Sequence, residues 1–365
     1  MPGALFVGLM SGTSLDGIDA VLVDLNSAQP NILKATTLPW SPTLLERLRA
    51  AAQGTFLTAE QFAQLHAETG QALAEAALSV IDPVSSRDIL AIGSHGQTLA
   101  HQPNATPGFT LQIGDASRIS EATGITTVAD FRARDIAAGG QGAPLVPAYH
   151  RAVFGSPQEN RVVLNIGGIA NISILPADGT PLSGFDTGPG NCLMDAWARQ
   201  HTGQVFDRDG AMAAAGSVDQ ALLQKLLADA YFQAPAPKST GTDYFSPRWL
   251  QGQLTGHSLS AQDVQATLLA LSAHSIAEAI RQAAPTCERV LVCGGGAHNP
   301  TLMAALAGQL DCPLESTAAY GIAPDWVEAV AFAWLAQQAL AGQPGNAPKV
   351  TGAAGPRVLG AIYPA

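Results

Sequence analysis

Glycine-rich turns recur along this chain, and most of them directly follow a short apolar segment. Glycine lets the backbone turn tightly or adopt left-handed conformations, so that successive N–H groups can converge on a bound anion. The pattern therefore favours strand-based lobes that present backbone cradles for anionic groups. The turns are MSGTSLDG, NIGG, FDTGPGN and CGGGAHNP.

The spacing of apolar residues predicts both strands and helices, and so a mixed α/β architecture. Strands are predicted at residues 4–9, 18–25, 32–38, 89–92, 161–164 and 289–293, and helices at 59–81, 266–283 and 326–340. A charged, glycine-rich stretch at 126–147 is interpreted as a boundary, and 341–355 as a loop. We expect two lobes with related hairpins and a cleft between them. The first comprises residues 1–130 plus about 345–365, and the second residues 131–344.

Composition excludes several classes of protein. Apolar residues make up 47% of the 365 residues and charged residues 13%, which indicates well-buried elements. The net charge of -11 disfavours nucleic acid and anionic membranes as partners. The N-terminus has no basic region before its apolar run, and no apolar stretch reaches the length of a membrane span, so we expect a cytoplasmic protein.

The cysteines do not form a pattern typical of a metal site or a disulfide framework. The chain has 4 of them, without a close CxxC pair, and we expect buried free thiols in a reducing compartment. They are Cys192, Cys287, Cys293 and Cys312.

The first turn, MSGTSLDG, combines glycines with hydroxyl and carboxylate side chains. Gly12 and Gly17 permit converging N–H groups, and Asp16 is a candidate for holding a hydrated Mg²⁺. The candidate hydroxyl donors are Ser11, Thr13 and Ser14. An ordinary β-hairpin turn is the alternative, because Asp-Gly is common in hairpins.

Two later turns strengthen the anion-binding interpretation. Gly167 and Gly168 follow one predicted strand, and Gly188 and Gly190 follow another. Asp186 is predicted at the end of that second strand, where its carboxylate can act as a general base towards a hydroxyl or water. A carboxylate that only caps the turn is the alternative.

The last turn could accommodate a nucleoside, although it matches no common nucleotide motif. Gly294, Gly295 and Gly296 present bare backbone against which an adenine or ribose can lie. Asn299 stands where a third glycine of GxGxxG would fall, which weakens a Rossmann interpretation. None of the lysines follows a glycine, so a P-loop is excluded.

A few polar residues elsewhere are candidates for a substrate pocket. His95 lies among small residues after a strand, with a structural histidine as the alternative. Arg132 and Arg134 can clamp a carboxylate, or they can form ion pairs with neighbouring aspartates. Glu328 opens an apolar helix, where an acidic residue stabilises the helix by default. A catalytic role for Glu328 is the alternative.

Taken together, the motifs resemble those of a known family, the anhydro-N-acetylmuramic acid kinases. They run in the expected order from near residue 8 to past residue 300. The matching segments are MSGTSLDGIDAVLVD, IGSHGQTLAHQP, LQIGD, ADFRARDIAAGGQGAPLVP, LNIGGIANIS, FDTGPGN, PKSTGTDYF and VCGGGAHNP.

The resemblance implies an actin/hexokinase/Hsp70-type, ribonuclease H-like fold whose two lobes close over ATP and sugar in a cleft. It implies hydrolytic opening of the 1,6-anhydro ring and transfer of the ATP γ-phosphate to O6, in peptidoglycan recycling. Asp186 would then deprotonate the attacking water, residues 12–17 would hold phosphates and Mg²⁺, and Arg132 or Arg134 would meet the lactyl carboxylate. A homodimer is also expected from the family.

Two other functions stay open at this point. An actin- or Hsp70-like ATP switch would share the lobes, but a chaperone would need a peptide-binding domain after residue 340. A kinase or ATPase of the same fold that acts on another sugar or an acyl group is the second.

Overall fold

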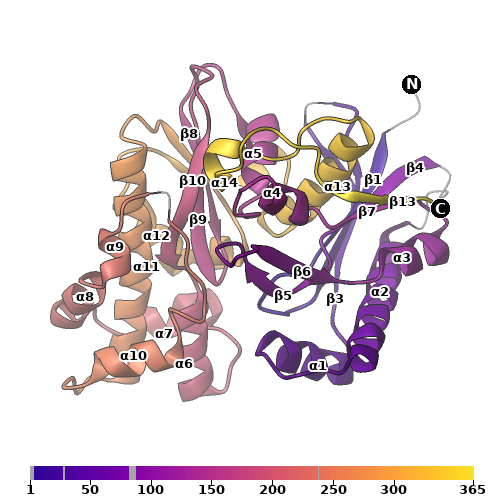
Figure 1. The fold of residues 1–365 in the computed structure, drawn as a ribbon. Coiled ribbons are helices and arrows are strands. Elements are labelled where there is room, and N and C mark those ends of the chain that lie inside the picture. Colours follow the sequence, from indigo (N-terminus) through magenta and orange to yellow (C-terminus); the bar gives the residue numbers. More distant parts are fainter. Residues whose placement is uncertain (1–3, 28, 82–87, 237) are drawn as a thin grey trace. The chain divides into compact units, whose positions relative to one another are not determined.

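The structure, a computed structural model, describes residues 4–27, 29–81, 88–236 and 238–365 (Figure 1). The chain forms two compact units. One consists of Met1–Val153 together with Trp326–Ala365, and the other is Phe154–Asp325. The predicted lobes, 1–130 plus about 345–365 and 131–344, divide the chain at other residues.

The first unit contains a six-stranded sheet of order β13-β7-β4-β1-β2-β3. Its first three strands pair antiparallel, while β4 and β7 continue the sheet in parallel from β1. The strands are β1 (Leu5–Met10), β2 (Ile18–Asp24), β3 (Asn31–Leu38), β4 (Ile89–Ser94), β7 (Thr127–Ala129) and β13 (Ala361–Tyr363), and β5 (Gln97–Gln102) and β6 (Phe109–Ile113) form a separate hairpin.

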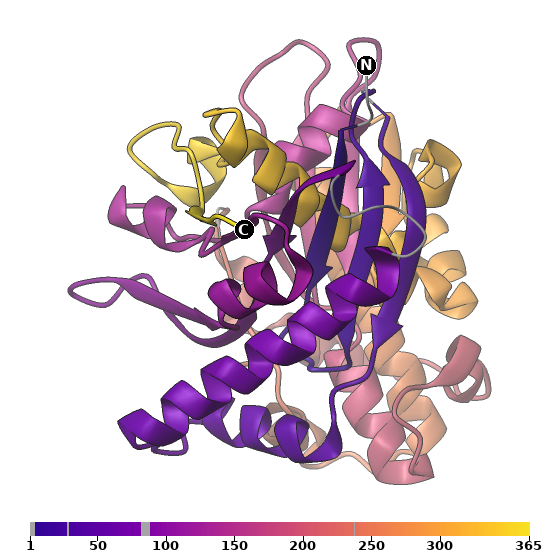
Figure 2. The ribbon, with the colours of Figure 1, turned by 90° about the vertical axis from the view of Figure 1, so that its right-hand side faces the viewer.

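Helices cover this sheet on both faces. The helices of the first unit are α1 (Pro42–Ala52), α2 (Ala59–Ile81), α3 (Ala116–Thr123), α4 (Ala133–Ala137), α5 (Val146–Phe154), α13 (Val327–Leu340) and α14 (Pro348–Thr351). Figure 2 shows α2 crossing one face of the sheet, where Val7 and Leu9 of β1 join its core. Successive residues of a strand face opposite sides, so Gly8 lies on the other face.

Helix α13 lies against that other face of the sheet and contacts β1 and β4. A Cβ atom on Gly8 would come within 1.9 Å of the Ala329 carbonyl oxygen, and one on Gly93 within 2.0 Å of the Phe332 oxygen. Only glycine allows the two backbones to approach so closely. This contact explains why 326–340, predicted to lie in the second lobe, belongs to the first unit.

The segment 126–147 is also part of the first unit rather than a boundary. It contains β7, α4 and the start of α5. The carboxylate of Asp135, which is fully buried, accepts hydrogen bonds from Gly142 N, Asn346 Nδ2 and Thr351 Oγ1 at 2.8, 2.7 and 2.9 Å. This network ties the glycine-rich stretch to the C-terminal segment.

The second unit repeats the strand order of the first. Its five-stranded sheet has the order β10-β9-β8-β11-β12, with three antiparallel strands followed by two parallel ones. Its strands are β8 (Arg161–Ile166), β9 (Ile169–Leu175), β10 (Ser183–Pro189), β11 (Arg289–Cys293) and β12 (Leu314–Ser316).

A long helix, α11 (Ala261–Ala283), packs against the sheet of this unit and against its shorter helices. The others are α6 (Cys192–Thr202), α7 (Ala211–Ala214), α8 (Gln220–Leu227), α9 (Ala230–Gln233), α10 (Pro247–Leu254) and α12 (Pro300–Ala307), and the 3-10 turns are η2 (Arg208–Gly210), η3 (Gly295–His298), η4 (Thr317–Tyr320) and η5 (Pro324–Trp326).

All cysteine thiols are free, and Cys293 is the one that is buried, whereas burial was expected for all. Among the described residues, no helix is both long and apolar enough to cross a membrane.

Candidate active site

The turn between β1 and β2 is closed by its own hydrogen bonds. Ser11 Oγ donates to the Gly17 carbonyl at 2.9 Å, and Leu15 N–H donates to the Gly12 carbonyl at 3.2 Å. The hydroxyl of Ser11 is therefore used within the turn, whereas Thr13 and Ser14 are exposed. These two hydroxyls remain at the surface of the turn, where a ligand can reach them.

The left-handed residue of this turn is Leu15, with φ of 59°, and not Gly12 or Gly17 as predicted. Gly17 is needed for a different reason, since a Cβ atom there would come within 2.6 Å of Thr37 Cγ2. A buried leucine at positive φ is strained, and such strain persists only where the surroundings hold the backbone in place. The turn is thus a fixed structure that presents Thr13, Ser14 and Asp16 on its exposed side.

Behind this turn, His95 connects it to Arg132. The Nδ1 atom of His95 lies 3.2 Å from the Ser11 carbonyl oxygen and 3.0 Å from that of Gly96. Its Nε2 atom lies 3.1 Å from Arg132 Nε and 3.0 Å from Nη2. Two carbonyl acceptors require a proton on Nδ1, and two guanidinium donors require a lone pair on Nε2, so the ring is neutral. Burial, followed by the charge of Arg132, lowers the pKa of His95 to about 3, which agrees with this form.

Arg132 is also held from its other side. Its Nη1 donates to the Gly142 carbonyl at 2.9 Å, in the stretch that Asp135 fixes. Burial lowers the pKa of Arg132 to about 10, and the nearby Glu328 opposes that shift. The guanidinium has further N–H groups on Nη1 and Nη2 beyond those used in these contacts, so it can still bind an anion.

Arg132 and Arg134 therefore differ in setting. Arg134 is exposed on α4, and within the described part of the chain its guanidinium makes no comparable contacts. Glu328 lies in the first turn of α13, as predicted, and is partly buried near Arg132. Burial raises the pKa of Glu328, the positive charge of Arg132 lowers it, and the negative charge of Asp19 raises it. Asp19, a half-buried carboxylate near the start of β2, was not among the residues predicted from the sequence.

In the second unit, Asp186 lies within β10 next to a β-bulge, and not at the strand end as predicted. Its Oδ2 accepts a hydrogen bond from Thr240 N–H at 3.0 Å, and its main-chain N–H donates to the Lys238 carbonyl at 3.0 Å. Burial raises the pKa of Asp186 to about 6, partly opposed by the hydrogen bond from Thr240. A carboxylate with this pKa is suited to accept a proton near neutral pH.

Asp186 is supported by residues of the motif PKSTGTDYF, whose first residue, Pro237, lies outside the described residues; the sequence predicted no role for any single residue of this motif. Lys238 Nζ donates to the carbonyls of Tyr231 and Phe232 at 2.9 and 3.2 Å, and the Tyr231 hydroxyl donates to the Asp186 carbonyl at 2.5 Å. These bonds fasten the segment beside β10. A lysine and hydroxyl-rich motif near an acidic strand is the signal that could have identified them.

The two glycine turns of this unit form one structure. Gly190 and Cys192 N–H donate to the Gly168 carbonyl at 2.9 and 3.1 Å, and Asn191 N–H donates to that of Gly167 at 2.9 Å. The N–H of Gly190 is therefore engaged in holding the turns together. Helix α6 starts directly after this joint, which brings the positive end of its dipole to the turns.

The glycines after β11 were predicted to expose bare backbone, and this holds for only some of them. Gly295 is exposed, and a Cβ atom there would meet nothing within 4 Å. Gly296 is buried against Ile166, and Gly294 N–H donates to the Pro324 carbonyl at 3.1 Å. Asn299 caps α12, since its Oδ1 accepts from Leu302 N–H at 3.0 Å.

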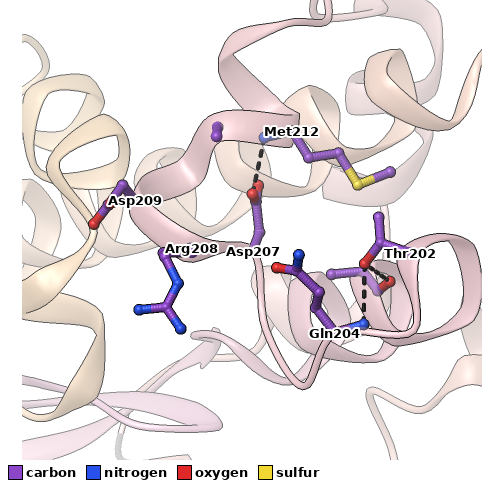
Figure 3. A pocket seen from close by; sticks show the side chains of 8 residues that line it. Thr202, Gln204, Asp207, Arg208, Asp209 and Met212 are labelled. Carbon is purple, nitrogen blue, oxygen red and sulfur yellow. Dashed lines mark hydrogen bonds between the residues drawn. The ribbon is translucent and has the colours of Figure 1, made fainter.

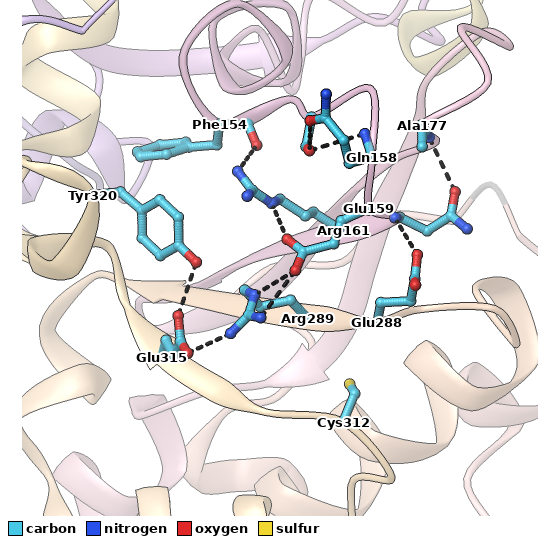
Figure 4. A network of polar contacts seen from close by, with 12 residues as sticks. Phe154, Gln158, Glu159, Arg161, Ala177, Glu288, Arg289, Cys312, Glu315 and Tyr320 are labelled. Carbon is cyan, nitrogen blue, oxygen red and sulfur yellow. Dashed lines mark hydrogen bonds and ion pairs between the residues drawn. The ribbon is translucent and has the colours of Figure 1, made fainter.

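Two surface hollows of the second unit contain none of the predicted site residues. One, of about 360 Å³, lies beside η2, and the Asp207 carboxylate there is occupied with Met212 and Ala213 N–H (Figure 3). The other, of about 370 Å³, borders Arg161 and Cys287. Near it, Arg161 and Arg289 share the Glu159 carboxylate (Figure 4), a network that links β8 to β11.

The fold and these two groups of residues define a class of protein. Each unit has three antiparallel strands followed by two parallel ones in the same order, and each has a hairpin turn after its first strand. This repeated arrangement is the two-part, ribonuclease H-like fold of the actin, hexokinase and Hsp70 class, as the sequence predicted.

Comparisons with known proteins identify the particular family. The family model described as anhydro-N-acetylmuramic acid kinase matches residues 4–365, and the chain belongs to this family. The anhydro-N-acetylmuramic acid kinase of Xanthomonas axonopodis pv. citri is 56% identical over 99% of this chain and 98% of that protein. That of Xylella fastidiosa is 52% identical over 100% of this chain and 97% of that protein. That of Cupriavidus metallidurans is 50% identical over 99% of this chain and 97% of that protein.

Solved structures with a distant likeness include a ROK family glucokinase from Streptomyces griseus in complex with glucose and AMPPNP. It covers 92% of this chain with 14% identity and a TM-score of 0.42. Component A of the Acidaminococcus fermentans (R)-2-hydroxyglutaryl-CoA dehydratase covers 90% with 12% identity and a TM-score of 0.49. The fold assignment rests on the strand order and not on these likenesses.

Proposed function

We propose that this chain uses ATP and water to convert 1,6-anhydro-N-acetylmuramic acid into N-acetylmuramic acid 6-phosphate and ADP, in the recycling of cell-wall peptidoglycan. Membership of the kinase family supports the reaction. The observation that carries the chemistry is Asp186, a mostly buried carboxylate whose pKa is raised to about 6 and whose position is fixed by Thr240.

Asp186 is the general base in this proposal. A water molecule attacks the anomeric carbon, Asp186 accepts a proton from that water, and the bond between the anomeric carbon and O6 breaks. The released O6 then attacks the γ-phosphorus of ATP, and ADP leaves. The hydrogen bond from Thr240 to Oδ2 orients the carboxylate, which leaves its other oxygen, Oδ1, to face the water.

Arg132 and Glu328 form the sugar-binding part of the proposal. Arg132 binds the lactyl carboxylate, because it is a fixed guanidinium that keeps N–H groups for an anion, whereas Arg134 is solvated. Glu328 is the second catalytic carboxyl. Its raised pKa lets it keep a proton at higher pH than an ordinary glutamate, so that it can share this proton with a sugar oxygen.

The nucleotide is assigned to the glycine turns. In the first unit, residues 12–17 are the candidates for binding phosphate oxygens. In the second unit, the candidates are the joined turns with Gly167, Gly168 and Gly190, together with Gly188, which lies within β10 and not after it as predicted. The bare backbone at 294–296 accommodates the adenosine, with Gly295 as the exposed contact. Stabilising the charge of the transferring phosphoryl group is the main task of such donors.

The turn also fits a magnesium ion. Mg²⁺ in such sites keeps several waters and binds one or two carboxylates together with the substrate phosphates. Asp16 is an exposed carboxylate on the turn and would hold the ion through water. When bound, the ion neutralises phosphate charge.

The direct test is to incubate the purified chain with ATP, magnesium and 1,6-anhydro-N-acetylmuramic acid and to look for the 6-phosphate by mass spectrometry. Asp186→Asn should keep the binding of both substrates and lower turnover by at least about a thousandfold, since the catalytic base is removed. ATP hydrolysis without a phosphorylated sugar would contradict the proposed function. Normal turnover of Asp186→Asn would remove only Asp186 from the base role.

We also propose that the chain acts in the cytoplasm, where ATP is supplied, and that it forms a homodimer, as the family resemblance suggests. Light scattering of the purified protein gives its molar mass directly. A mass equal to that of one 37.5 kDa chain at micromolar concentration would contradict the dimer.

A further inference from the structure

We infer that His95 is a positioning residue, which fixes Arg132 and the first hairpin turn in one arrangement and does not itself bind the substrate. This inference rests on the proposed function, in which Arg132 binds the sugar and the turn binds phosphates. It assigns to His95 a role different from the direct sugar contact expected from the sequence.

The first support is the way in which both ring nitrogens are occupied. Nδ1 faces the carbonyl oxygens of Ser11 and Gly96, and Nε2 faces the Nε and Nη2 atoms of Arg132, all at 3.0–3.2 Å. The imidazole has no third polar atom with which to bind a sugar. Its two nitrogens therefore act as a rigid link between one carbonyl of the turn and one guanidinium.

The second support is that the ring itself cannot move freely. His95 is 5% exposed, and its ring lies 4.8 Å from that of Phe332, measured between centroids. Phe332 is four residues after Glu328 in α13, so the two side chains lie on the same face of the helix. The main-chain N–H of His95 also donates to the Leu9 carbonyl at 3.0 Å, which places the residue directly beside the end of β1.

The third support is the geometry that remains at Arg132. His95 binds the Nε edge and Nη2, and the Gly142 carbonyl binds Nη1. Nη1 and Nη2 each carry a second N–H group beyond these bonds, with which the guanidinium can bind a carboxylate. His95 and Gly142 together fix the orientation of the guanidinium, and in this sense His95 acts through Arg132.

Two substitutions can separate the two functions of the ring. In His95→Asn, the short amide can replace Nδ1 as the donor to Ser11, but it cannot reach Arg132. In His95→Gln, the longer amide can offer its oxygen to Arg132, but it loses the donor to Ser11. The amide groups of Asn and Gln each provide both a donor and an acceptor, so that the two variants are chemically matched.

The expected kinetic results are opposite for the two variants. His95→Asn should raise KM for the anhydro sugar by about 10- to 100-fold and leave KM for ATP within about twofold, because a hydrogen bond to a charged group is lost. His95→Gln should raise KM for ATP by about 3- to 10-fold, as expected for one neutral hydrogen bond, and keep the sugar KM near that of the wild type. Combining His95→Asn with Arg132→Lys should raise the sugar KM no further than Arg132→Lys alone.

A control variant separates this role from a general loss of stability. His66→Asn alters a different histidine of the first unit, which is partly buried and whose Nδ1 accepts from Gly114 N–H at 3.1 Å. It should change neither KM. If both His95 variants lower the melting temperature like His66→Asn and leave both KM values unchanged, His95 is only structural and the inference is wrong.

A measurement without turnover keeps the inference separate from the proposed function. In protein with ¹⁵N-labelled histidine, the resonances of His95 should show a proton on Nδ1 and none on Nε2, without titration between about pH 6 and 8. A proton on Nε2 would overturn the inference even in an active enzyme. The predicted resonances in a protein that does not phosphorylate the sugar would contradict the proposed function alone.

Discussion

Ionising the Asp186 carboxyl takes more free energy than ionising a carboxyl in water, because the side chain is largely removed from solvent. The one hydrogen bond from Thr240 compensates only in part. The same burial that moves the pKa of Asp186 towards neutrality, and so makes it a better base, therefore makes the folded chain less stable when the group is charged.

The pH dependence of catalysis should reflect this pKa. We expect kcat/KM for the sugar to fall about tenfold per pH unit below pH 6, since only the ionised carboxylate can accept the proton. An unshifted aspartate would keep full activity down to about pH 4. Initial rates from about pH 4.5 to 8 test this, with ATP binding measured at the same pH values as the control. A flat profile down to pH 5 would argue against Asp186 as the base.

The stability of the chain should respond to the same group. Between the ordinary pKa of 3.8 and the folded-state value of about 6, the folded chain holds more protons than the unfolded one. Its free energy of unfolding therefore falls as pH rises through this window. At pH 7, Asp186→Asn should be more stable than the wild type by on the order of 1–3 kcal/mol.

Thermal melting at two pH values tests this prediction. The gain of Asp186→Asn should be present at pH 7 and should vanish near pH 4, where Asp186 itself is neutral in the folded chain. A variant that melts below the wild type at both pH values would show that the carboxylate is better accommodated than its burial implies.

At the scale of elements, α13 connects the core of the first unit to its candidate site residues. It is apolar on nearly every side and lies close to two strands at Gly8 and Gly93. It also carries Glu328, which interacts electrostatically with Arg132, and Phe332, whose ring packs against that of His95. A displacement of α13 away from the sheet would thus change both the core and the proposed sugar-binding residues.

Gly93→Ala tests this packing. The new methyl group would meet the Phe332 carbonyl at 2.0 Å, so that the helix must shift, and we expect a loss of about 1–3 kcal/mol in the free energy of unfolding. Gly252→Ala is the matched control, because a Cβ atom on that helical glycine would meet nothing within 4 Å among the described residues outside its own helix turn, and alanine favours helices. Chemical denaturation measures both. Equal stability of the two variants would contradict the close approach.

Elements with a strong local pattern could be predicted from the sequence. The helix expected at 59–81 is α2 with the same bounds, and the strands around the first turn agree to within a residue or two. The β5–β6 hairpin has a weaker pattern, since β5 mixes polar and apolar residues on each face and only β6, FTLQI, alternates regularly over its five residues. It was therefore missed.

The sequence indicated which residues are candidates for the site, but it did not indicate which of their side chains contact one another. His95 and Arg132 are 37 positions apart, and nothing in the local pattern indicates that their side chains meet. The choice between Arg132 and Arg134 likewise depends on burial beside α13, which is distant in sequence. The left-handed Leu15 escaped prediction because the adjacent glycines were the obvious candidates.

At the scale of the whole molecule, the two units differ in how the chain builds them. The second unit is one continuous segment, Phe154–Asp325, with its own apolar core. The first unit needs two segments, because α13 and β13 come from the C-terminal part and pack on strands of the N-terminal part.

Fragments of the chain should therefore behave differently. Residues 154–325 expressed alone should unfold cooperatively, because the sheet and α11 are all present. Residues 1–153 alone should lack a cooperative transition and aggregate, since the face of β1 and β4 that α13 covers is exposed. Calorimetry and light scattering measure both properties. Addition of a peptide of residues 326–365 should partly restore the transition, and a fully cooperative 1–153 fragment would contradict the prediction.

The discontinuous first unit has a consequence for synthesis in the cell. Ribosomes add roughly 5–20 residues per second, so α13 emerges tens of seconds after β1, the strand that it must cover. During that interval the second unit can already fold, while the apolar face of β1 and β4 that α13 will cover stays exposed to solvent. A helix made late in synthesis thus completes a sheet made early, and the nascent chain is most vulnerable to aggregation in the interval before α13 emerges.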